Sequence, residues 1–188
     1  MNKYIFDIRS LSQTDFRHYY ENMTYLRRER VSRLKIKEDK IRTVSGEMLV
    51  KKHFGEDTVI DIDNNGKPFL KNKKGDFSIS HSGNFVLVAV SDEKIGADIE
   101  CIRPVNENII KKICTQEEAD YVINAEAEEK NIRLLLIWTF KEAYFKYLGT
   151  GLGNFQSVSY FDDNIKKEQG ICENYVYHII YSIAPYGG

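Results

Sequence analysis

Two acidic residues, Asp98 and Glu100, follow an apolar run and are separated only by Ile99. In an extended strand, side chains two positions apart point to the same face, so both carboxylates would lie together while Ile99 faces the core. Neighbouring carboxylates repel each other unless a cation lies between them. Mg2+ is typically bound by one or two carboxylates together with phosphates and water, which makes it the natural occupant. The alternative is that both acids face solvent at a strand end, as most acidic residues do.

A second charged pair, Glu142 and Lys146, is spaced by four positions, and Trp138 precedes Glu142 by four. On a helix these three side chains share one face. One interpretation is an ordinary surface ion pair beside a core tryptophan. The other is that Glu142 completes a three-carboxylate magnesium site with the strand acids, while Lys141 and Lys146 contact bound phosphates.

Other polar residues could bind an anion. Basic residues outnumber acidic ones between residues 27 and 42, which indicates either a solvated helix face or a cradle for phosphate groups. His81, near the end of an expected strand, is either structural or positioned to bind a phosphate or to exchange a proton. Lys67 follows a tight Asn-Gly turn and is either a surface charge or a second phosphate contact.

Strands and helices must position these residues. Alternating or continuous apolar patterns predict strands over residues 4–8, 59–62, 77–80, 85–90, 95–100, 155–161 and 175–183. Helical patterns cover residues 15–52, as two helices broken near Ser32, and then residues 106–114, 116–124 and 132–148, the last ending at Gly149. Each half therefore runs strand, helices, strands. We expect an α+β fold built of two α/β lobes, residues 1–94 and 95–188.

Composition narrows the class of protein. The chain has 188 residues, of which 42% are hydrophobic and 29% charged, which is typical of a globular protein. A formal net charge of -1 provides no overall basic field, so we expect neither nucleic acid nor membrane as a partner. The three cysteines form no zinc or redox motif and fit a reducing cytosol, and no apolar run could span a bilayer, so we expect a cytoplasmic protein.

Four motifs occur in order and cover most of the chain: Gly66–Pro68, Ile79–Gly83, Gly96–Glu100 and Trp138–Lys146. Any one of them is a weak signal, but the four together at these separations are specific. In them the chain resembles a 4′-phosphopantetheinyl transferase of the two-lobed surfactin-synthetase-activating (Sfp) type.

The resemblance implies an enzyme that transfers the phosphopantetheine arm of coenzyme A, its co-substrate, to a serine hydroxyl of an acyl or peptidyl carrier protein. It further implies that Mg2+ is required and that 3′,5′-ADP is released. The implied fold is a pseudo-dimer of two similar lobes with coenzyme A in the cleft between them, and such a chain is expected to act as a monomer. The resemblance does not distinguish between carrier proteins of fatty-acid synthesis and those of secondary metabolism, which includes polyketide and peptide synthesis.

The resemblance also implies the site residues. Its metal ligands fall on Asp98, Glu100 and Glu142. Its contacts to coenzyme A fall on Arg27, Arg30, Thr43, Lys67, Ser80, His81, Lys141 and Lys146. Among these, Glu142 is expected to be the base that accepts the serine proton, and Lys146 to neutralise charge on the leaving group.

Two other functions are compatible with the same residues. The chain could be a module that binds coenzyme A or a nucleotide without transferring anything, although binding alone needs fewer carboxylates near the phosphates. It could also be a magnesium-dependent hydrolase that cleaves a pyrophosphate linkage.

Overall fold

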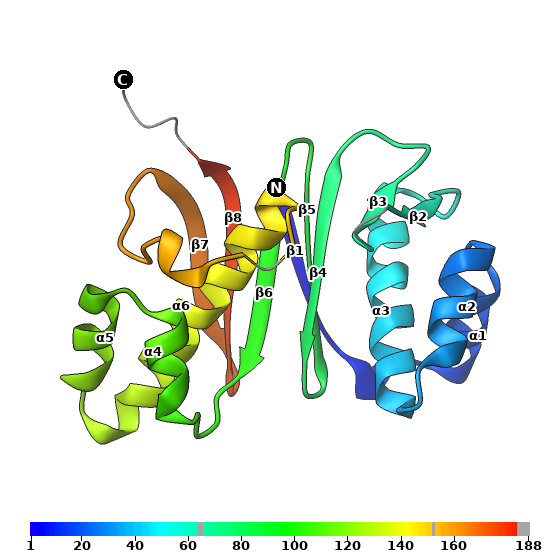
Figure 1. The fold of residues 1–188 in the computed structure, drawn as a ribbon. Coiled ribbons are helices and arrows are strands. Elements are labelled where there is room, and N and C mark those ends of the chain that lie inside the picture. The colour runs from blue at the N-terminus through cyan, green and yellow to red at the C-terminus, as the bar shows by residue number, and fades with distance from the viewer. Residues whose placement is uncertain (64–65, 152, 184–188) are drawn as a thin grey trace. The chain divides into compact units, whose positions relative to one another are not determined.

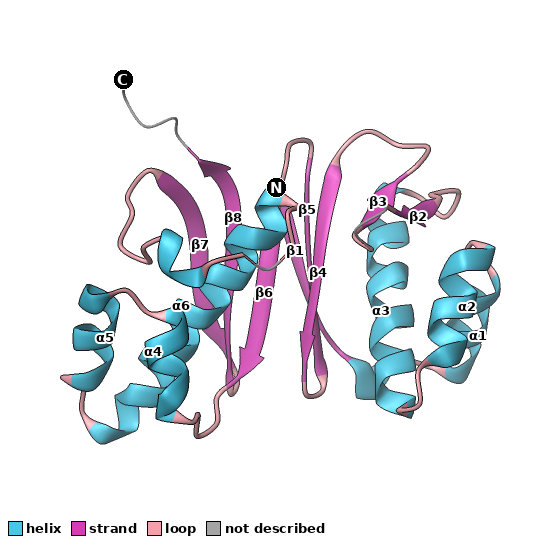
Figure 2. Cartoon of the chain, in the orientation of Figure 1, coloured by secondary structure: helices cyan, strands magenta, loops and turns pink. Residues whose placement is uncertain are grey.

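The chain divides into two compact units, Met1–Ile95 and Gly96–Gly188 (Figure 1). The computed structural model describes residues 1–63, 66–151 and 153–183. The boundary expected between residues 94 and 95 lies one residue earlier than this division. Helices and antiparallel sheets occur in both units, which confirms the α+β fold class (Figure 2).

The first unit contains a three-stranded sheet, a small two-stranded sheet and three α-helices. Its elements are β1 (Asn2–Asp7), η1 (Ile8–Ser10), α1 (Gln13–Glu21), α2 (Tyr25–Arg33), α3 (Lys37–Phe54), β2 (Ile60–Ile62), β3 (Pro68–Leu70), β4 (Asp76–Ser82) and β5 (Phe85–Ser91). The main sheet has the order β1-β5-β4 with antiparallel pairing, so the last strand of the unit is central.

The core of the first unit forms between α3 and the central strand β5. Val44 and Met48 of α3 belong to the same buried cluster as Val86, Val88 and Val90 of β5. These valines alternate along the strand, so they share the face that α3 covers. Almost all of β5 is buried, as its uninterrupted apolar sequence indicates.

The segment expected to form two helices forms three. α1 begins at Ser12, whose side chain accepts a hydrogen bond from the backbone nitrogen of Asp15, and it ends before Thr24. The break expected near Ser32 is found at Leu34 and Ile36, which have extended backbones. Ser32 lies in the last turn of α2, where its hydroxyl donates to the carbonyl of Glu29.

The second unit repeats this plan with a longer helix. Its elements are β6 (Gly96–Cys101), η2 (Glu107–Ile109), α4 (Ile110–Ile113), α5 (Gln116–Ile123), α6 (Ala127–Leu148), η3 (Phe155–Ser157), β7 (Ile165–Cys172) and β8 (Tyr175–Ile183). The sheet has the order β6-β8-β7, again antiparallel and again with the last strand in the centre.

Helix α6 packs against this sheet (Figure 1). Leu134, Ile137 and Phe140 of α6 share a buried cluster with Ile165 and Ile180 of the strands. The helix ends at Gly149, which has a left-handed backbone, as its sequence predicts. None of the helices in the described ranges, α6 included, is long and apolar enough to cross a membrane.

The strand expected over residues 155–161 is not formed. Phe155–Ser157 is a short 3₁₀ helix instead, and its first turn is capped by Asn154, whose side chain accepts from the backbone nitrogen of Gln156. The ring of Phe155 stacks on Trp138 of α6, with centroids 5.6 Å apart and an interplanar angle of 16°. The aromatic pattern that indicated a strand therefore reflects packing on a helix.

His178 of β8 lies at the centre of a buried polar chain. Its Nδ1 lies 2.9 Å from Oγ1 of Thr139 on α6, and its Nε2 lies 3.0 Å from Oε1 of Gln169 on β7. Gln169 also accepts from the hydroxyl of Tyr160. Burial, and to a smaller extent the positive charge of Lys167, lower the pKa of His178 to about 3.

The buried histidine predicts acid sensitivity. The unfolded chain protonates His178 near its ordinary pKa, whereas the folded chain resists protonation down to about pH 3. The folded state therefore loses stability as pH falls below about 6.5, by about 2 kcal/mol between pH 7 and 5. Urea unfolding followed by the emission of Trp138 should show this loss, and His178→Gln should abolish that part of it.

The control for this experiment is His18→Gln, because His18 is exposed on α1. The control should keep the wild-type dependence on pH. An unchanged dependence in His178→Gln would mean that another group causes the acid sensitivity.

Candidate active site

The site forms where α6 lies directly on strand β6. A Cβ atom added at Gly96 would lie 2.1 Å from the carbonyl oxygen of Ala143 and 2.4 Å from the backbone nitrogen of Tyr147. No real Cβ approaches backbone atoms so closely, so only glycine permits this contact. Residues 142–147 of α6 are therefore held against the start of the strand that carries the paired acids.

Across this contact Lys146 meets Asp98. The Nζ atom of Lys146 donates to Oδ1 of Asp98 at 2.6 Å, and the Asp98 side chain is only 6% exposed. Glu142 lies one turn earlier on α6, partly buried. The helix and the strand thus bring a carboxylate from each element together with one ammonium group.

The pKa of Glu142 shows which charged side chains lie near it. Its pKa is raised to about 7, first by burial and then by the negative charge of Asp98, with Glu100 adding in the same direction and Lys146 opposing. The two strand carboxylates, Asp98 and Glu100, therefore both act on Glu142. Among the residues that the structure describes, no three His, Cys, Asp or Glu side chains converge closely enough to hold a metal ion.

Lys141, predicted to contact a phosphate, lies elsewhere. Its side chain is fully buried, and its Nζ atom donates to Oε2 of Glu118 at 2.5 Å and to the carbonyl oxygens of Ile113 and Phe155 at 2.7 and 2.8 Å. An ammonium group has three donors, and all three are used here. This corrects the prediction, because Lys141 has no donor left for a phosphate.

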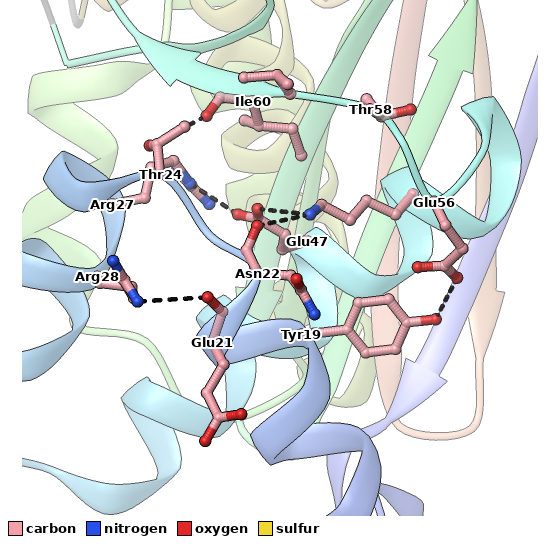
Figure 3. A network of polar contacts seen from close by, with 12 residues as sticks. Tyr19, Glu21, Asn22, Thr24, Arg27, Arg28, Glu47, Glu56, Thr58 and Ile60 are labelled. Atoms are coloured by element: carbon pink, nitrogen blue, oxygen red, sulfur yellow. Dashed lines mark hydrogen bonds and ion pairs between the residues drawn. The ribbon is translucent and has the colours of Figure 1, made fainter.

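Arg27, predicted to contact the 3′-phosphate, is also buried. Its Nε atom donates to Oε2 of Glu47 at 2.8 Å, and the two side chains are 6% and 1% exposed. Figure 3 shows Arg27 beside Glu47. The Nζ atom of Lys51 also lies 3.8 Å from Oε1 of Glu47, and it donates to the carbonyl of Asn22 at 2.9 Å. The prediction for Arg27 is corrected: the guanidinium neutralises a buried carboxylate that joins α2 to α3.

Arg30, three residues further along α2, is exposed. Its Nη1 atom donates to the carbonyl of Gly66 at 3.1 Å, which places it beside the residue that precedes Lys67. The Nζ atom of Lys67 lies 3.7 Å from Oδ2 of Asp76 at the start of β4. The structure thus brings Arg30 and Lys67 to the same part of the first unit.

Three other predicted contacts lie on α3 and β4 of the first unit. Thr43 donates its hydroxyl to the carbonyl of Asp39 within the helix, Ser80 is buried, and His81 is exposed on the next position of β4. Arg42 joins the two elements, because its Nη1 atom donates to the carbonyl of Gly83 at 2.6 Å, just beyond β4.

The sequence patterns did not single out Glu118 or Glu47, and Arg42 was included only as part of the basic segment 27–42. Thr115 and Glu118 form a capping box at the start of α5, and the Thr-x-x-Glu pattern was available as a signal. That pattern predicts a helix start but not a buried ion pair. Arg42 and Glu47 also have local partners, Asp39 and Lys51. These local pairs do not predict the contacts with Gly83 and Arg27, which are distant in the sequence.

Comparison with known proteins defines the family. The sequence model of the 4′-phosphopantetheinyl transferase superfamily matches residues 94–182. The 4′-phosphopantetheinyl transferase ffp of Bacillus subtilis is 30% identical over 152 residues, which are 77% of this chain and 68% of that protein. The chain belongs to this superfamily. It is therefore an enzyme of the phosphopantetheinyl transferase type, and the resemblance noted from its four motifs is confirmed.

Two further relatives carry the same description. The 4′-phosphopantetheinyl transferase Sfp of Bacillus subtilis strain 168 is 29% identical over 152 residues, or 77% of this transferase and 68% of Sfp. The 4′-phosphopantetheinyl transferase gsp of Aneurinibacillus migulanus is 30% identical over 122 residues, or 61% of this chain and 51% of that protein. The segment matched by the superfamily includes Asp98, Glu100, Glu142 and Lys146.

The contact at Gly96 predicts a sensitive position in this transferase. Gly96→Ala would force the backbones of α6 and β6 apart, since neither Ala143 nor Tyr147 offers a movable side-chain atom. We expect a loss of about 3 kcal/mol in the free energy of unfolding, measured by urea titration.

Gly170→Ala is the matched control on β7. Its Cβ would lie 2.5 Å from the hydroxyl of Tyr177, so it would meet side-chain atoms of one residue rather than the backbone of a neighbouring helix. The control should therefore cost less than Gly96→Ala, about 1 kcal/mol. Equal losses in the two variants would show that the contact between α6 and β6 is not specially tight.

Proposed function

We propose that this chain transfers the 4′-phosphopantetheine group of coenzyme A to a serine hydroxyl of an acyl or peptidyl carrier protein, with Mg2+ present and with release of 3′,5′-ADP. The observation that carries the proposal is the group formed by Asp98, Glu142 and Lys146 where α6 meets β6. It lies within the segment that matches the transferase superfamily.

The type of donor at this point suits Mg2+, although the three carboxylates do not converge on one point in this structure. Asp98, Glu100 and Glu142 would hold it, because carboxylate oxygens are its usual protein ligands. Their mutual repulsion contributes to the raised pKa of Glu142, and a divalent cation would relieve that repulsion. When bound, Mg2+ would supply positive charge to the diphosphate and to the leaving group. Lys146 already donates to Asp98, so we propose that its ammonium group and the metal ion compete for this carboxylate.

Glu142 is the group we propose as general base. Burial and the neighbouring carboxylates raise the pKa of Glu142 to about 7 without the ion, and a bound cation would lower it, so the carboxylate would be ionised and able to accept a proton at neutral pH. It would take the proton from the carrier serine as the hydroxyl oxygen attacks phosphorus. Lys146, once released from Asp98, would stabilise negative charge on the phosphate that leaves.

Residues of the first unit supply the proposed contacts to coenzyme A. Arg30 contacts Gly66, the residue before Lys67, and Thr43 and His81 lie on α3 and β4, which Arg42 links. Arginine and lysine suit phosphate oxygens, since both carry a lasting positive charge. Ser80 is kept in the proposed set, and Arg27 and Lys141 are not.

The first test of the function is Glu142→Gln. Incubation of the wild-type chain with Mg2+, coenzyme A and an apo-carrier should raise the carrier's mass by one phosphopantetheine. The variant should lose at least about 100-fold in kcat, because the amide cannot accept the proton. Its thermal stability should stay equal or rise, since a repelled carboxylate has been removed.

The matched control is Glu128→Gln, an exposed position in the first turn of α6. It should transfer at the wild-type rate. Wild-type turnover in Glu142→Gln would remove Glu142 from the mechanism. Cleavage of coenzyme A without gain of mass on the carrier would support a hydrolase, and neither reaction would support a binding module.

The second test measures Mg2+ binding directly, by calorimetry without substrates. Asp98→Asn should weaken binding at least about tenfold, because one charged ligand is lost. Lys146→Met should strengthen binding, because the competing ammonium group is gone, while transfer falls. Asp92→Asn, exposed between β5 and β6, should bind like the wild type. Unchanged affinity in Asp98→Asn would show that the metal is held elsewhere.

A further inference from the structure

The buried ammonium of Lys141 needs an explanation beyond the phosphate contact that it does not make. It lies in the middle of α6, fully buried, with one carboxylate and two backbone carbonyls as acceptors. Those acceptors belong to α5, to the end of α4 and to η3. A single side chain thus connects α6 to three other elements.

Its partner Glu118 is equally constrained. Oε2 of Glu118 accepts from Lys141 and from the backbone nitrogen of Thr115, and Oε1 accepts from the backbone nitrogen of Tyr160 at 2.6 Å. The Glu118 side chain is fully buried as well. The carboxylate therefore holds the start of α5 and the segment that leads into β7.

A buried ion pair of this kind adds little to the free energy of unfolding. Removing two charges from water costs several kcal/mol for each ion, and well-packed apolar residues of similar volume are often as stable or more so. Hydrogen bonds, unlike apolar contacts, fix the direction in which each group points. The pair is therefore suited to fixing a geometry.

The geometry that it fixes is the rotation of α6. The opposite side of the helix lies on Gly96 and carries Lys146 to Asp98, while Lys141 anchors the side that faces α4, α5 and η3. Glu142 is the next residue, about 100° further round the helix. At a side-chain radius of about 5–6 Å, a rotation of roughly 30° would move the end of Glu142 by about 3 Å.

The same anchor holds η3 against the helix. Lys141 binds the carbonyl of Phe155, whose ring stacks on Trp138 and meets Phe145 edge-on at 5.4 Å. Gln156 adds two further bonds, to the carbonyls of Lys111 and Cys114. Trp138 is the only tryptophan of the chain, so its emission reports whether η3 stays in place.

We propose that Lys141 and Glu118 are positioning residues of the transfer reaction, which direct Glu142 toward Asp98 and hold η3 on α6. This inference rests on the proposed function. Neither residue touches substrate, and both act through the orientation of the helix.

The test uses two variants of the full-length chain. Glu118→Gln keeps a hydrogen-bonding side chain of the same size, and Lys141→Met/Glu118→Gln removes both charges without leaving one of them buried alone. We expect kcat to fall about tenfold in the first and about 100-fold in the second, because a displacement of about 1 Å can cost a factor of 100. The KM for coenzyme A should stay within about twofold, since its proposed phosphate contacts are untouched.

Two readouts do not depend on turnover. The affinity for Mg2+, measured by calorimetry, should weaken with kcat, because Glu142 no longer faces the other carboxylates. The emission of Trp138 should shift to longer wavelength as η3 loosens. Lys130→Met, near the start of the same helix, is the control and should match the wild type in every measurement.

The outcomes separate the possible roles. A folded variant with wild-type kcat and wild-type Mg2+ affinity would reduce the pair to ordinary stabilisation and overturn the inference. A KM for coenzyme A that rises tenfold with kcat unchanged would return Lys141 to direct phosphate binding and overturn it as well. If the wild type transfers nothing, the proposed function fails, and the Mg2+ and tryptophan measurements still decide whether the pair orients Glu142.

Discussion

The approach of α6 to β6 at Gly96 is the constraint on which the candidate site depends. Backbone atoms of Ala143 and Tyr147 occupy the space that any side chain at position 96 would need. A helix that rests on backbone rather than on side chains has little freedom to slide or tilt. Asp98 and Lys146 can therefore meet at 2.6 Å although they are far apart in the sequence.

Charged side chains in this protein serve two different purposes. Lys141 and Arg27 are buried with Glu118 and Glu47, one pair in each unit, and both hold helices together. Lys146, in contrast, is partly exposed beside Asp98 and stays within reach of solvent. A cation that must exchange partners during a reaction needs such exposure, whereas a cation that fixes a helix needs the opposite.

Much of the fold could be predicted from the sequence, and so could the strand and the helix that carry Asp98, Glu142 and Lys146. The paired acids on a strand and the Glu-Lys face of a helix were readable because spacing determines which side chains share a face. The division into two units followed from the order of apolar patterns.

Lys141 and Arg27 were misassigned because a buried cation and an exposed one have the same charge and the same spacing in the sequence. Only their partners distinguish the two, and Glu118 and Glu47 lie about 20 positions away in each case. The aromatic run after α6 was misread for a similar reason, since Phe155 packs on Trp138 rather than in a sheet.

The strand order has a consequence for how the chain is made. In each unit the central strand, β5 or β8, is the last to be synthesised among the described strands. While the ribosome is still adding residues, the two outer strands of each three-stranded sheet, β1 and β4 or β6 and β7, lack the central strand with which they pair, so neither of these sheets can close early. The first unit can close as soon as β5 has emerged, before the second unit is complete, because domains generally fold in the order of their synthesis. Until β5 arrives, the edges of β1 and β4 are unpaired backbone, which is where a nascent chain of this kind is most open to misassociation.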